Sequence, residues 1–405
     1  MISTAAVMAD QQVRILVVVD AFPVVSETFV VDHVLGLVRS GFYVTVVAMS
    51  GDMEAKQQIE ARSGLRFDLV SFSSFARPNR WMRMAWLLGA TGLKRIGALF
   101  SPWERDLILK GLMLSRNMRR LHPRLIHAHF GPNAMLASIA ARDMGIPCIA
   151  DFHGYDVTII PKRYGWEPYQ RWLGHVTAAV HSSFVQELIE KNIPCRIARV
   201  HLGVDTDVFS APERAKGWPK EIRFLFVGRL VYQKGVHVAL GMMAIFRRHF
   251  PEYGAHLSIC GDGPDLGFFR QCAREFGVEE HVTFIGAASH AGVSSRMAAS
   301  DVLLIPSLPV ASGWDEAFCR VAVEGMAMKM AVIGSRTGGL EETIGTGGHT
   351  FRAGSAMGLF VAVKKILNDS SPRQEGDRAG ERASQFTIRR MDDAYAQIVD
   401  QSMPV

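Results

Sequence analysis

Apolar runs alternate with amphipathic stretches along the chain and divide it into two parts of similar build. Residues 13–19 are apolar at almost every position, the pattern of a strand buried on both faces of a parallel sheet. A helix is predicted over 26–38 and a second strand over 43–49. The same strand–helix order starts again with an apolar strand over 222–227 and a helix over 236–246. We therefore predict an α/β protein with two Rossmann-like domains.

Two glutamates flank the start of a predicted helix in the second half of the chain. A strand over 303–305 ends at a proline, and the next strand is predicted over 331–333. Between them, Glu316 lies in the loop before a short helix that begins at Arg320, and Glu324 lies within that helix. A helix N-terminus favours a phosphate, and nearby carboxylates can accept hydrogen bonds from sugar hydroxyls. The pattern favours a nucleotide-sugar site over the alternative, two unrelated glutamates on a surface helix.

Basic residues and glycines follow the opening strands of the same domain. Arg229 comes directly after Gly228 at a strand end, and Lys234 precedes the next helix. Two cations at a strand-to-helix turn can neutralise a diphosphate in place of a metal ion; the alternative is a pair of solvated surface cations. Gly261 and Gly263 follow the next strand, and by themselves they would indicate only a generic turn. We expect no metal here, because no acidic ligand set accompanies the cations.

Three histidines mark strand ends in the first half of the chain. His127 and His129 alternate along a predicted strand, so their side chains share one face. A metal site would need a third ligand, and none follows at an obvious spacing, so we interpret this pair as packing residues or acceptor contacts. His153 follows a strand predicted over 146–152, at the edge where open α/β sheets bind ligands. The alternative for His153 is a histidine that caps a loop.

The bulk composition suits a two-domain globular protein and argues against several other classes. The chain has 405 residues, of which 48% are hydrophobic and 21% are charged. Its five cysteines include no Cys-x-x-Cys pair, which favours a reducing cytoplasm and argues against a structural zinc. No Gly-x-Gly-x-x-Gly follows the first strand, so a dinucleotide dehydrogenase is not expected. We expect neither a signal peptide nor a membrane-spanning helix.

The segment 77–124 concentrates positive charge. It contains eleven basic and two acidic residues with aromatic residues interleaved, in a chain whose net charge is +6. Such a segment can bind an anionic membrane surface or a lipid diphosphate; the alternative is a solvated surface helix. We expect no nucleic-acid partner, because no reading motif accompanies the charge. The predicted location is the cytoplasm, with peripheral association at the inner membrane.

Several motifs, taken with the two glutamates, resemble glycosyltransferase family 4, a family of retaining enzymes with the GT-B fold. They are FPVVSETFV (22–30), HAHFG (127–131), FHGYDV (152–157), VHLGVDTDVF (200–209), FVGRLVYQKG (226–235) and CGDGP (260–264). The first two are similar to motifs of bacterial transferases that build exopolysaccharide and related surface glycans. The resemblance implies two Rossmann-like domains that face each other across a cleft, with a C-terminal helix crossing back to the first domain.

The resemblance also implies the domain limits and the site residues. The acceptor-binding domain is predicted over 1–203 with the terminal segment 384–405, and the donor-binding domain over 204–383. The donor would contact Gly228, Arg229, Lys234, Gly261, Gly263, Ile285, Glu316, Phe318, Cys319, Arg320, Val321 and Glu324. The acceptor would contact Ser26, Glu27, Thr28, His129 and His153. The predicted catalytic residues are Glu316, His153, Arg229 and Lys234. We interpret residues 364–380 as a surface linker and predict a terminal helix over 386–399.

The activity that the resemblance implies is retaining transfer of a hexosyl unit without cofactor or metal. The donor would be a UDP- or GDP-sugar, and the acceptor a glycan or lipid-linked oligosaccharide of surface polysaccharide biosynthesis. The chain departs from the family at 26–28, where a Gly-Gly loop is common, and at Cys319, where Pro or Gly is common. The alternatives are a GT-B sugar-nucleotide epimerase, a glycan hydrolase that uses paired carboxylates, and a non-catalytic nucleotide-sugar sensor.

Overall fold

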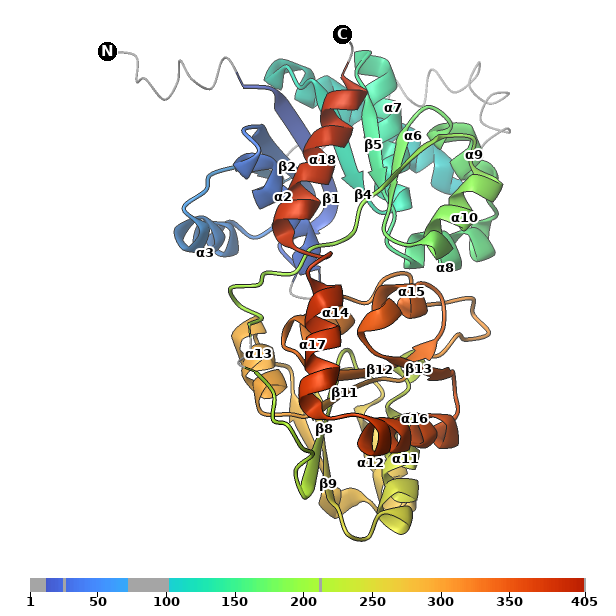
Figure 1. Ribbon diagram of the computed structural model, residues 1–405. Helices are drawn as coiled ribbons and strands as arrows, with labels where there is room; N and C mark the ends of the chain where they lie inside the picture. The colour runs from blue at the N-terminus through green and yellow to red at the C-terminus, as the bar shows by residue number, and fades with distance from the viewer. Residues whose placement is uncertain (1–11, 25–26, 72–101, 211–212, 404–405) are drawn as a thin grey trace. The chain divides into compact units, whose positions relative to one another are not determined.

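The computed structural model describes residues 12–24, 27–71, 102–210 and 213–403, which form two compact units (Figure 1). The first unit contains the described residues before Ser182, residues 185–201 and the residues from Met391 onward. The second unit contains residues 182–184 and 202–390. Each unit is built on one parallel sheet flanked by helices, which confirms the prediction of two Rossmann-like domains.

The first unit is organised around a seven-stranded sheet with the strand order β3-β2-β1-β4-β5-β6-β7. Its central strand β1 pairs in parallel with β2 and β4, and residues 15–18 are fully buried, as expected for a strand covered on both faces. The strands are β1 (Arg14–Phe22), β2 (Tyr43–Gly51), β3 (Asp68–Ser71), β4 (Leu125–His129), β5 (Cys148–Asp151), β6 (Thr177–Val180) and β7 (Arg196–Arg199).

Helices cover this first sheet, and the last of them comes from the end of the chain. They are α2 (Thr28–Arg39), α3 (Met53–Ser63), α6 (Pro102–Met118), α7 (Gly131–Met144), α8 (Tyr155–Tyr164), α9 (Glu167–Leu173), α10 (Ser183–Asn192) and α18 (Ile388–Ser402). In α18, Asp392 pairs with Arg39 of α2, with Nε and Oδ2 2.8 Å apart. Tyr395 donates a 2.6 Å hydrogen bond to Asp151 of β5. These two interactions tie the terminal helix to α2 and to the sheet (Figure 1).

The second unit contains a six-stranded sheet with the order β10-β9-β8-β11-β12-β13, again parallel throughout. Its strands are β8 (Glu221–Val227), β9 (Gly254–Cys260), β10 (Val282–Gly286), β11 (Val302–Ile305), β12 (Ala331–Arg336) and β13 (His349–Arg352). Successive residues of a strand point to opposite faces. Phe224 accordingly packs in a core with α11 (Val236–His249), α12 (Leu266–Glu275) and α16 (Ala356–Asp369). Leu225 packs on the other side with α13 (His290–Ala298), α14 (Arg320–Ala327), α15 (Leu340–Ile344) and α17 (Pro372–Ala383).

The prediction of a surface linker over 364–380 is wrong, because this stretch belongs to the helices α16 and α17. Most of the buried apolar residues of α16 lie before residue 364, so the stretch 364–380 includes only the end of the apolar pattern of this helix. Helix α17 begins with a capping box in which Ser371 and Gln374 bond each other's backbone N–H groups. Its buried residues include Glu375 and the small residues Gly376, Ala379 and Ala383, which together give a weak apolar signal.

No helix in the described part of the chain is long and apolar enough to cross a membrane. Most of the basic segment predicted to meet a membrane surface, residues 77–101, lies outside the described residues. Its remainder contains α6, on which Leu109 and Leu112 are exposed. The prediction of membrane association therefore stays a prediction.

Candidate functional site

Three glycine turns meet at the carboxyl edge of the second sheet. Gly228 directly follows β8 and donates its N–H to the carbonyl of Cys260, and Gly261 donates its N–H to the carbonyl of Gly286 at the end of β10. Gly228 and Gly261 have φ angles of 158° and 148°, which residues with a side chain rarely adopt. A Cβ atom on Gly261 would overlap the carbonyl of Gly228, and one on Gly263 would overlap that of Leu230. Glycine is therefore required at 261 and 263 for the backbones to approach this closely.

The strongest polar contact at this edge joins Lys234 to Glu316. Lys234 ends a 3₁₀ turn, Tyr232–Lys234, that follows β8, and its Nζ lies 2.6 Å from Oε2 of Glu316. The side chains are 26% and 8% exposed, so the pair is largely shielded from water. Burial alone would lower the pKa of Lys234, but the Glu316 charge outweighs it and raises that pKa. Lys234 is therefore a fixed positive charge at neutral pH.

Residues that the sequence analysis did not select hold Glu316 in place. Ser307 donates a 2.9 Å hydrogen bond to the same Oε2 atom that Lys234 contacts. Asp315 Oδ1 accepts from the Glu316 N–H at 2.9 Å and also from the hydroxyl of Thr337. Gly339 donates its N–H to the Glu316 carbonyl at 2.7 Å. Thr337 directly follows β12, and Gly339 lies two positions further on, so their place after a strand was a signal that could have identified them.

The helix after Glu316 begins as predicted and carries the second glutamate. Cys319 is the N-cap of α14 and makes no side-chain capping bond to the first turn. Glu324 is buried within the helix, and its Oε1 lies 3.8 Å from Nε of Arg320. Burial, followed by the charge of Glu316, raises the pKa of the Cys319 thiol to about 12. Cys319 is therefore an uncharged residue at the helix start, where a thiolate would compete with an incoming anion.

The other predicted donor residues lie at the same edge with different surroundings. Arg229 is exposed, and its side chain makes no hydrogen bond or ion pair with another described residue. Ile285 of β10, Phe318 and Val321 are partly buried against the core formed with α14. The structure thus brings Lys234 and Glu316 together and leaves the Arg229 side chain in solvent.

In the first unit, the predicted histidines belong to a larger buried cluster. The ring of His129 joins two others: its Nε2 lies 2.9 Å from Nδ1 of His33, and its Nδ1 lies 2.9 Å from Nε2 of His153. His127 contacts Asp151, with Nε2 and Oδ2 3.1 Å apart. The sequence analysis found no third ligand beside the 127/129 pair. The structure supplies several from other elements, because β4, β5 and α2 are distant in the sequence and adjacent in the fold.

Burial sets the charge of this cluster. It lowers the pKa of His129 to about 3 and the pKa values of His33 and His153 well below their usual range, with the neighbouring Asp151 charge opposing the shift. For Asp151, burial alone would raise the pKa, but the contacts with His181 and His127 outweigh it and lower the pKa. Burial alone would lower the pKa of His181, but the charge and hydrogen bond of Asp151 outweigh it and raise that pKa. The cluster therefore combines neutral imidazoles at His33, His129 and His153 with an ionised Asp151 that pairs with His181.

A second carboxylate fixes the loop that carries His153. Asp156 accepts the N–H groups of His153 and Gly154 on Oδ1, at 3.0 and 2.9 Å. Its Oδ2 accepts the Gly131 N–H at 2.9 Å, at the start of α7. Burial raises the pKa of Asp156 to about 6, with the backbone N–H donors opposing the shift. Asp156 thus joins the HAHFG and FHGYDV motifs.

The remaining predicted acceptor residues precede α2. Ser26 lies outside the described residues. Glu27 occupies the N-cap position and makes no side-chain capping bond. Burial, followed by the charge of Asp20, raises the pKa of Glu27. Thr28 is the first residue of α2.

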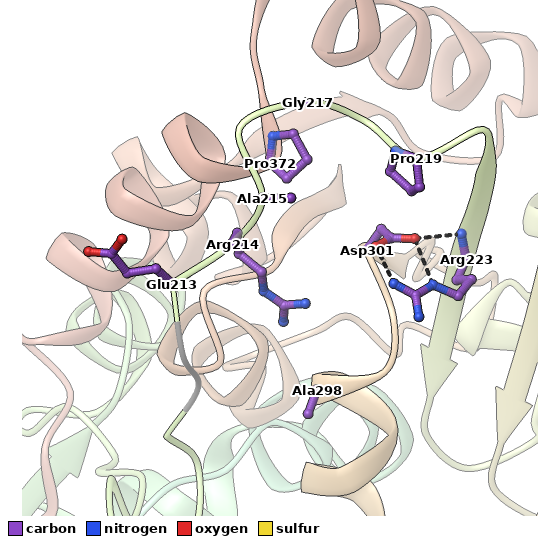
Figure 2. A pocket seen from close by; sticks show the side chains of 9 residues that line it. All are labelled: Glu213, Arg214, Ala215, Gly217, Pro219, Arg223, Ala298, Asp301 and Pro372. Carbon is purple, nitrogen blue, oxygen red and sulfur yellow. Dashed lines mark hydrogen bonds and ion pairs between the residues drawn. The ribbon is translucent and has the colours of Figure 1, made fainter.

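A separate hollow in the second unit contains none of the predicted site residues. Figure 2 shows its lining, in which Asp301 binds Arg223 through paired bonds of 2.8 and 3.1 Å. The guanidinium of Arg214 donates to main-chain carbonyls, among them those of Ser300 and Met328. The charged groups of this hollow are satisfied within the protein, so we assign it a structural role.

Comparisons with known proteins match almost the whole chain. The model of "Glycosyltransferase Family 4" matches residues 26–208, and that of "Glycosyl transferases group 1" matches residues 211–385. The glycogen synthase of Mycobacterium tuberculosis is 28% identical over 334 residues, which are 78% of this chain and 75% of the relative. WcaL of Escherichia coli, which by its name is a colanic acid biosynthesis glycosyltransferase, is 27% identical over 80% of this chain and 82% of its own.

The fold has known structural counterparts as well. Anabaena HepE, solved in complex with UDP and glucose, aligns with 96% of this chain and 100% of its own at a TM-score of 0.69 and 16% identity. At that identity the likeness concerns the fold, which is that of the GT-B glycosyltransferases. The chain belongs to glycosyltransferase family 4, as the two consecutive family models show.

Proposed function

We propose that this glycosyltransferase moves a hexosyl unit from a nucleoside diphosphate sugar to a glycan or lipid-linked acceptor in surface polysaccharide biosynthesis. The Lys234–Glu316 pair carries the proposal. It places a shielded cation and a carboxylate 2.6 Å apart, at the same sheet edge as glycine turns whose backbones approach each other closely. The complex of HepE with UDP and glucose supports a nucleotide-sugar donor, and the name of WcaL supports a surface glycan as product.

In the proposed reaction, each donor residue has one task. Lys234 and the exposed Arg229 neutralise the diphosphate as it leaves, so no metal ion is needed at that position. Glu316 accepts hydrogen bonds from hydroxyls of the transferred sugar, and Glu324 accepts them from the ribose. The first turn of α14 donates main-chain N–H groups to sugar and phosphate. Retention follows if the acceptor hydroxyl attacks from the face that the diphosphate leaves and gives its proton to a diphosphate oxygen.

The acceptor side of the proposal rests on the first unit. His153, His129 and the residues at the start of α2 would bind the acceptor hydroxyl and the transferred sugar. We place the protein in the cytoplasm, with the basic segment 77–124 against the cytoplasmic face of the inner membrane. Arg105 and Lys110 of α6, together with its exposed Leu109 and Leu112, give the described part of that segment a mixed cationic and apolar character.

The test is a binding and transfer assay with the purified full-length protein. A panel of UDP- and GDP-sugars is first screened by thermal shift, since a ligand that binds the folded state raises the melting temperature. The stabilising donor, labelled in its sugar, is then incubated with lipid-linked oligosaccharides in the presence of EDTA. We expect labelled product whose new linkage keeps the anomeric configuration of the donor. Inversion would contradict the retaining step, and dependence on Mg²⁺ would contradict the role given to the two cations.

The same assay separates the alternative functions. A glycan hydrolase would release free sugar from glycan without nucleotide. An epimerase would convert the donor into its epimer when no acceptor is present. A sensor would bind the donor and leave it intact with every acceptor. Any of these results would replace the proposed transferase function.

A further inference from the structure

Three aromatic rings meet at the carboxyl edge of the first sheet. Phe29 is the second residue of α2, Phe130 directly follows β4, and His153 follows β5 by two positions. The centroid of the His153 ring lies 4.4 Å from that of Phe29 and 4.7 Å from that of Phe130. The two phenylalanine centroids lie 6.2 Å apart. Such separations are typical of aromatic side chains in contact, so the three rings form one aromatic cluster.

The aromatic cluster lies where the strand order of the sheet reverses. In the order β3-β2-β1-β4-β5-β6-β7, the chain runs outward from β1 to β2 on one side and from β4 to β5 on the other. The connections that leave β1 and β4 therefore diverge, and open α/β sheets bind ligands between such connections. Phe29 belongs to the connection after β1, and Phe130 to the connection after β4. The two rings thus flank the position that the topology favours for a ligand.

Both phenylalanines of the aromatic cluster reach the surface of the protein. Phe22, Phe67 and Phe152 of the same unit are at most 4% exposed, whereas Phe29 and Phe130 are partly exposed. An aromatic ring that remains partly in water forgoes some of the stabilisation that full burial gives. A ligand that covers these two residues would recover that stabilisation.

The backbone of Phe130 has a conformation that bulky residues rarely adopt. Its φ is 69° and its ψ is 140°, and glycine would adopt a positive φ at lower cost. Two main-chain bonds hold it there: its N–H donates to the Asp151 carbonyl, and its carbonyl accepts the Ala134 N–H, both at 2.8 Å. Strain that the surrounding structure maintains is concentrated at ligand sites. A partly exposed ring does not repay this cost by packing alone, which indicates a role in binding.

The residues beside the aromatic cluster favour a sugar over a lipid chain as the ligand. A hexose carries C–H groups on the faces of its ring and hydroxyls around its rim, so it packs a face on an aromatic ring and bonds polar groups at its edge. Glu27 and Thr28 precede Phe29 and are both partly exposed, and the Glu27 side chain makes no capping bond. A lipid chain would instead need further apolar residues around the two rings.

We propose that Phe29 and Phe130 bind a hexose ring of the acceptor glycan by stacking against its C–H face. The inference rests on the proposed function and deepens it, since it makes a cyclic sugar, and not the lipid carrier, the part of the acceptor that the first unit recognises. The two rings orient the sugar and take no part in the chemical step. His153, which contacts both rings, keeps the hydroxyl-binding role proposed for it.

The first experiment measures sugar binding without a donor. The full-length protein is mixed with the methyl glycosides of glucose, galactose and mannose, and saturation of its aromatic protons is followed by NMR as it transfers to the sugar. We expect transfer to the C–H protons of one ring face in at least one of these sugars. Phe29→Leu and Phe130→Leu keep an apolar side chain without the ring, and each should weaken binding about 2–10-fold. Phe29→Tyr should recover most of the affinity lost in Phe29→Leu.

The second experiment measures transfer kinetics. Phe29→Leu and Phe130→Leu should raise the KM for the acceptor by a similar factor and leave the KM for the donor unchanged. The control is Phe42→Leu, which changes a partly exposed phenylalanine before β2, at the opposite edge of the sheet, and should behave as wild type does. Circular dichroism identifies any variant that fails to fold.

The outcomes separate this site from its alternatives. Absence of saturation transfer to all three sugars would overturn the proposal. If the rings only cover the histidine cluster, the leucine variants lower the melting temperature and leave the acceptor KM unchanged, which would also overturn it. A loss seen with lipid-linked acceptors but not with the glycan freed of its lipid would assign the rings to the lipid chain. Ring-dependent sugar binding without any transfer would uphold the aromatic site and contradict the proposed transferase function.

Discussion

Nζ of Lys234 and Oε2 of Glu316 lie 2.6 Å apart, although 82 residues separate them in the chain. Lys234 follows the end of β8, and Glu316 lies between β11 and α14. Since β8 and β11 are neighbours in a parallel sheet, their carboxyl ends bring the two residues together. The pairing gives each charge a partner in a site that is largely closed to water.

Removal of either member of this pair should abolish transfer. Lys234→Ala removes the cation proposed to stabilise the leaving diphosphate, and Glu316→Ala removes the carboxylate proposed to bind the sugar. We expect each to lower turnover by about 10²–10³. Initial rates with the donor identified by thermal shift are the measurement. Glu280→Gln, at an exposed position, is the control and should keep the wild-type rate. Near wild-type rates in both alanine variants, with the fold intact, would exclude the proposed site.

Alanine substitutions at Gly263 and at Gly267 should change the stability of the protein in opposite directions. A Cβ atom on Gly263 would overlap the carbonyl of Leu230, whereas nothing lies within 4 Å of one on Gly267 in α12. We expect Gly263→Ala to lower the free energy of unfolding by about 1–3 kcal/mol. Gly267→Ala should raise it by about 0.5–1 kcal/mol, because alanine loses less conformational freedom in a helix. Urea unfolding measures both, and equal behaviour of the two variants would contradict the close backbone approach at 263.

The hydroxyl of Tyr395 should contribute to the stability of the first unit. Tyr395 is buried and donates a 2.6 Å hydrogen bond to the ionised Asp151. Tyr395→Phe removes that donor and leaves the buried carboxylate with one partner fewer, at a cost of about 1–3 kcal/mol. Tyr155→Phe is the matched control, since the Tyr155 side chain is 54% exposed. Thermal unfolding followed by circular dichroism compares the two. A melting temperature for Tyr395→Phe equal to that of the control would show that the bond adds nothing.

Glu375 should make the stability of the second unit depend on acid pH. Its Oε2 lies 2.9 Å from Nε2 of His349 and 3.7 Å from Nη1 of Arg378. Burial alone would raise the pKa of Glu375, but the bond to His349 and the nearby charges outweigh it and lower the pKa. A carboxyl group with a lowered pKa in the folded state stabilises the protein above its unfolded pKa of about 4.3. That stabilisation is lost as the pH falls through the folded pKa.

The variant Glu375→Gln tests this dependence. Its melting temperature should lie below that of wild type at pH 7, and the gap should narrow as the pH falls below about 4. Glu280→Gln again serves as the control, and its melting temperature should equal that of wild type at both pH values. If the difference in melting temperature between wild type and Glu375→Gln stays constant from pH 7 to acid pH, the ionisation of Glu375 does not contribute to stability.

The sequence predicted those features whose signal is local. Apolar runs such as 13–19 predicted buried parallel strands, and both Glu316 and Glu324 lie where a loop and a helix were expected. Ser307 was missed because a hydroxyl that orients a carboxylate has no pattern of its own, and the place of Thr337 directly after β12 was the one signal for that residue. The helix α17 was missed because small residues form its buried face, which resembles the composition of a linker.

The histidine cluster shows why the rest could not be predicted. The His127 and His129 pair was visible as an alternation along one strand. Asp151 and His181 join it only because β4, β5 and β6 lie side by side in register, as when His129 pairs with Asp151. Ligands that come from separate strand ends have no fixed spacing in the sequence. A search for a third ligand near residue 129 therefore could not find them.

The position of α18 has a consequence for how the chain matures during synthesis. Residues from Met391 onward belong to the unit that opens the chain, whereas 202–390 form the other unit almost by themselves. Tyr395 can therefore reach Asp151 only after it has emerged from the ribosome, and residues 202–390 emerge before it. The unit formed by residues 202–390 can therefore complete its folding first. Until α18 packs on the first sheet, the buried carboxylate of Asp151 lacks its hydrogen bond from Tyr395.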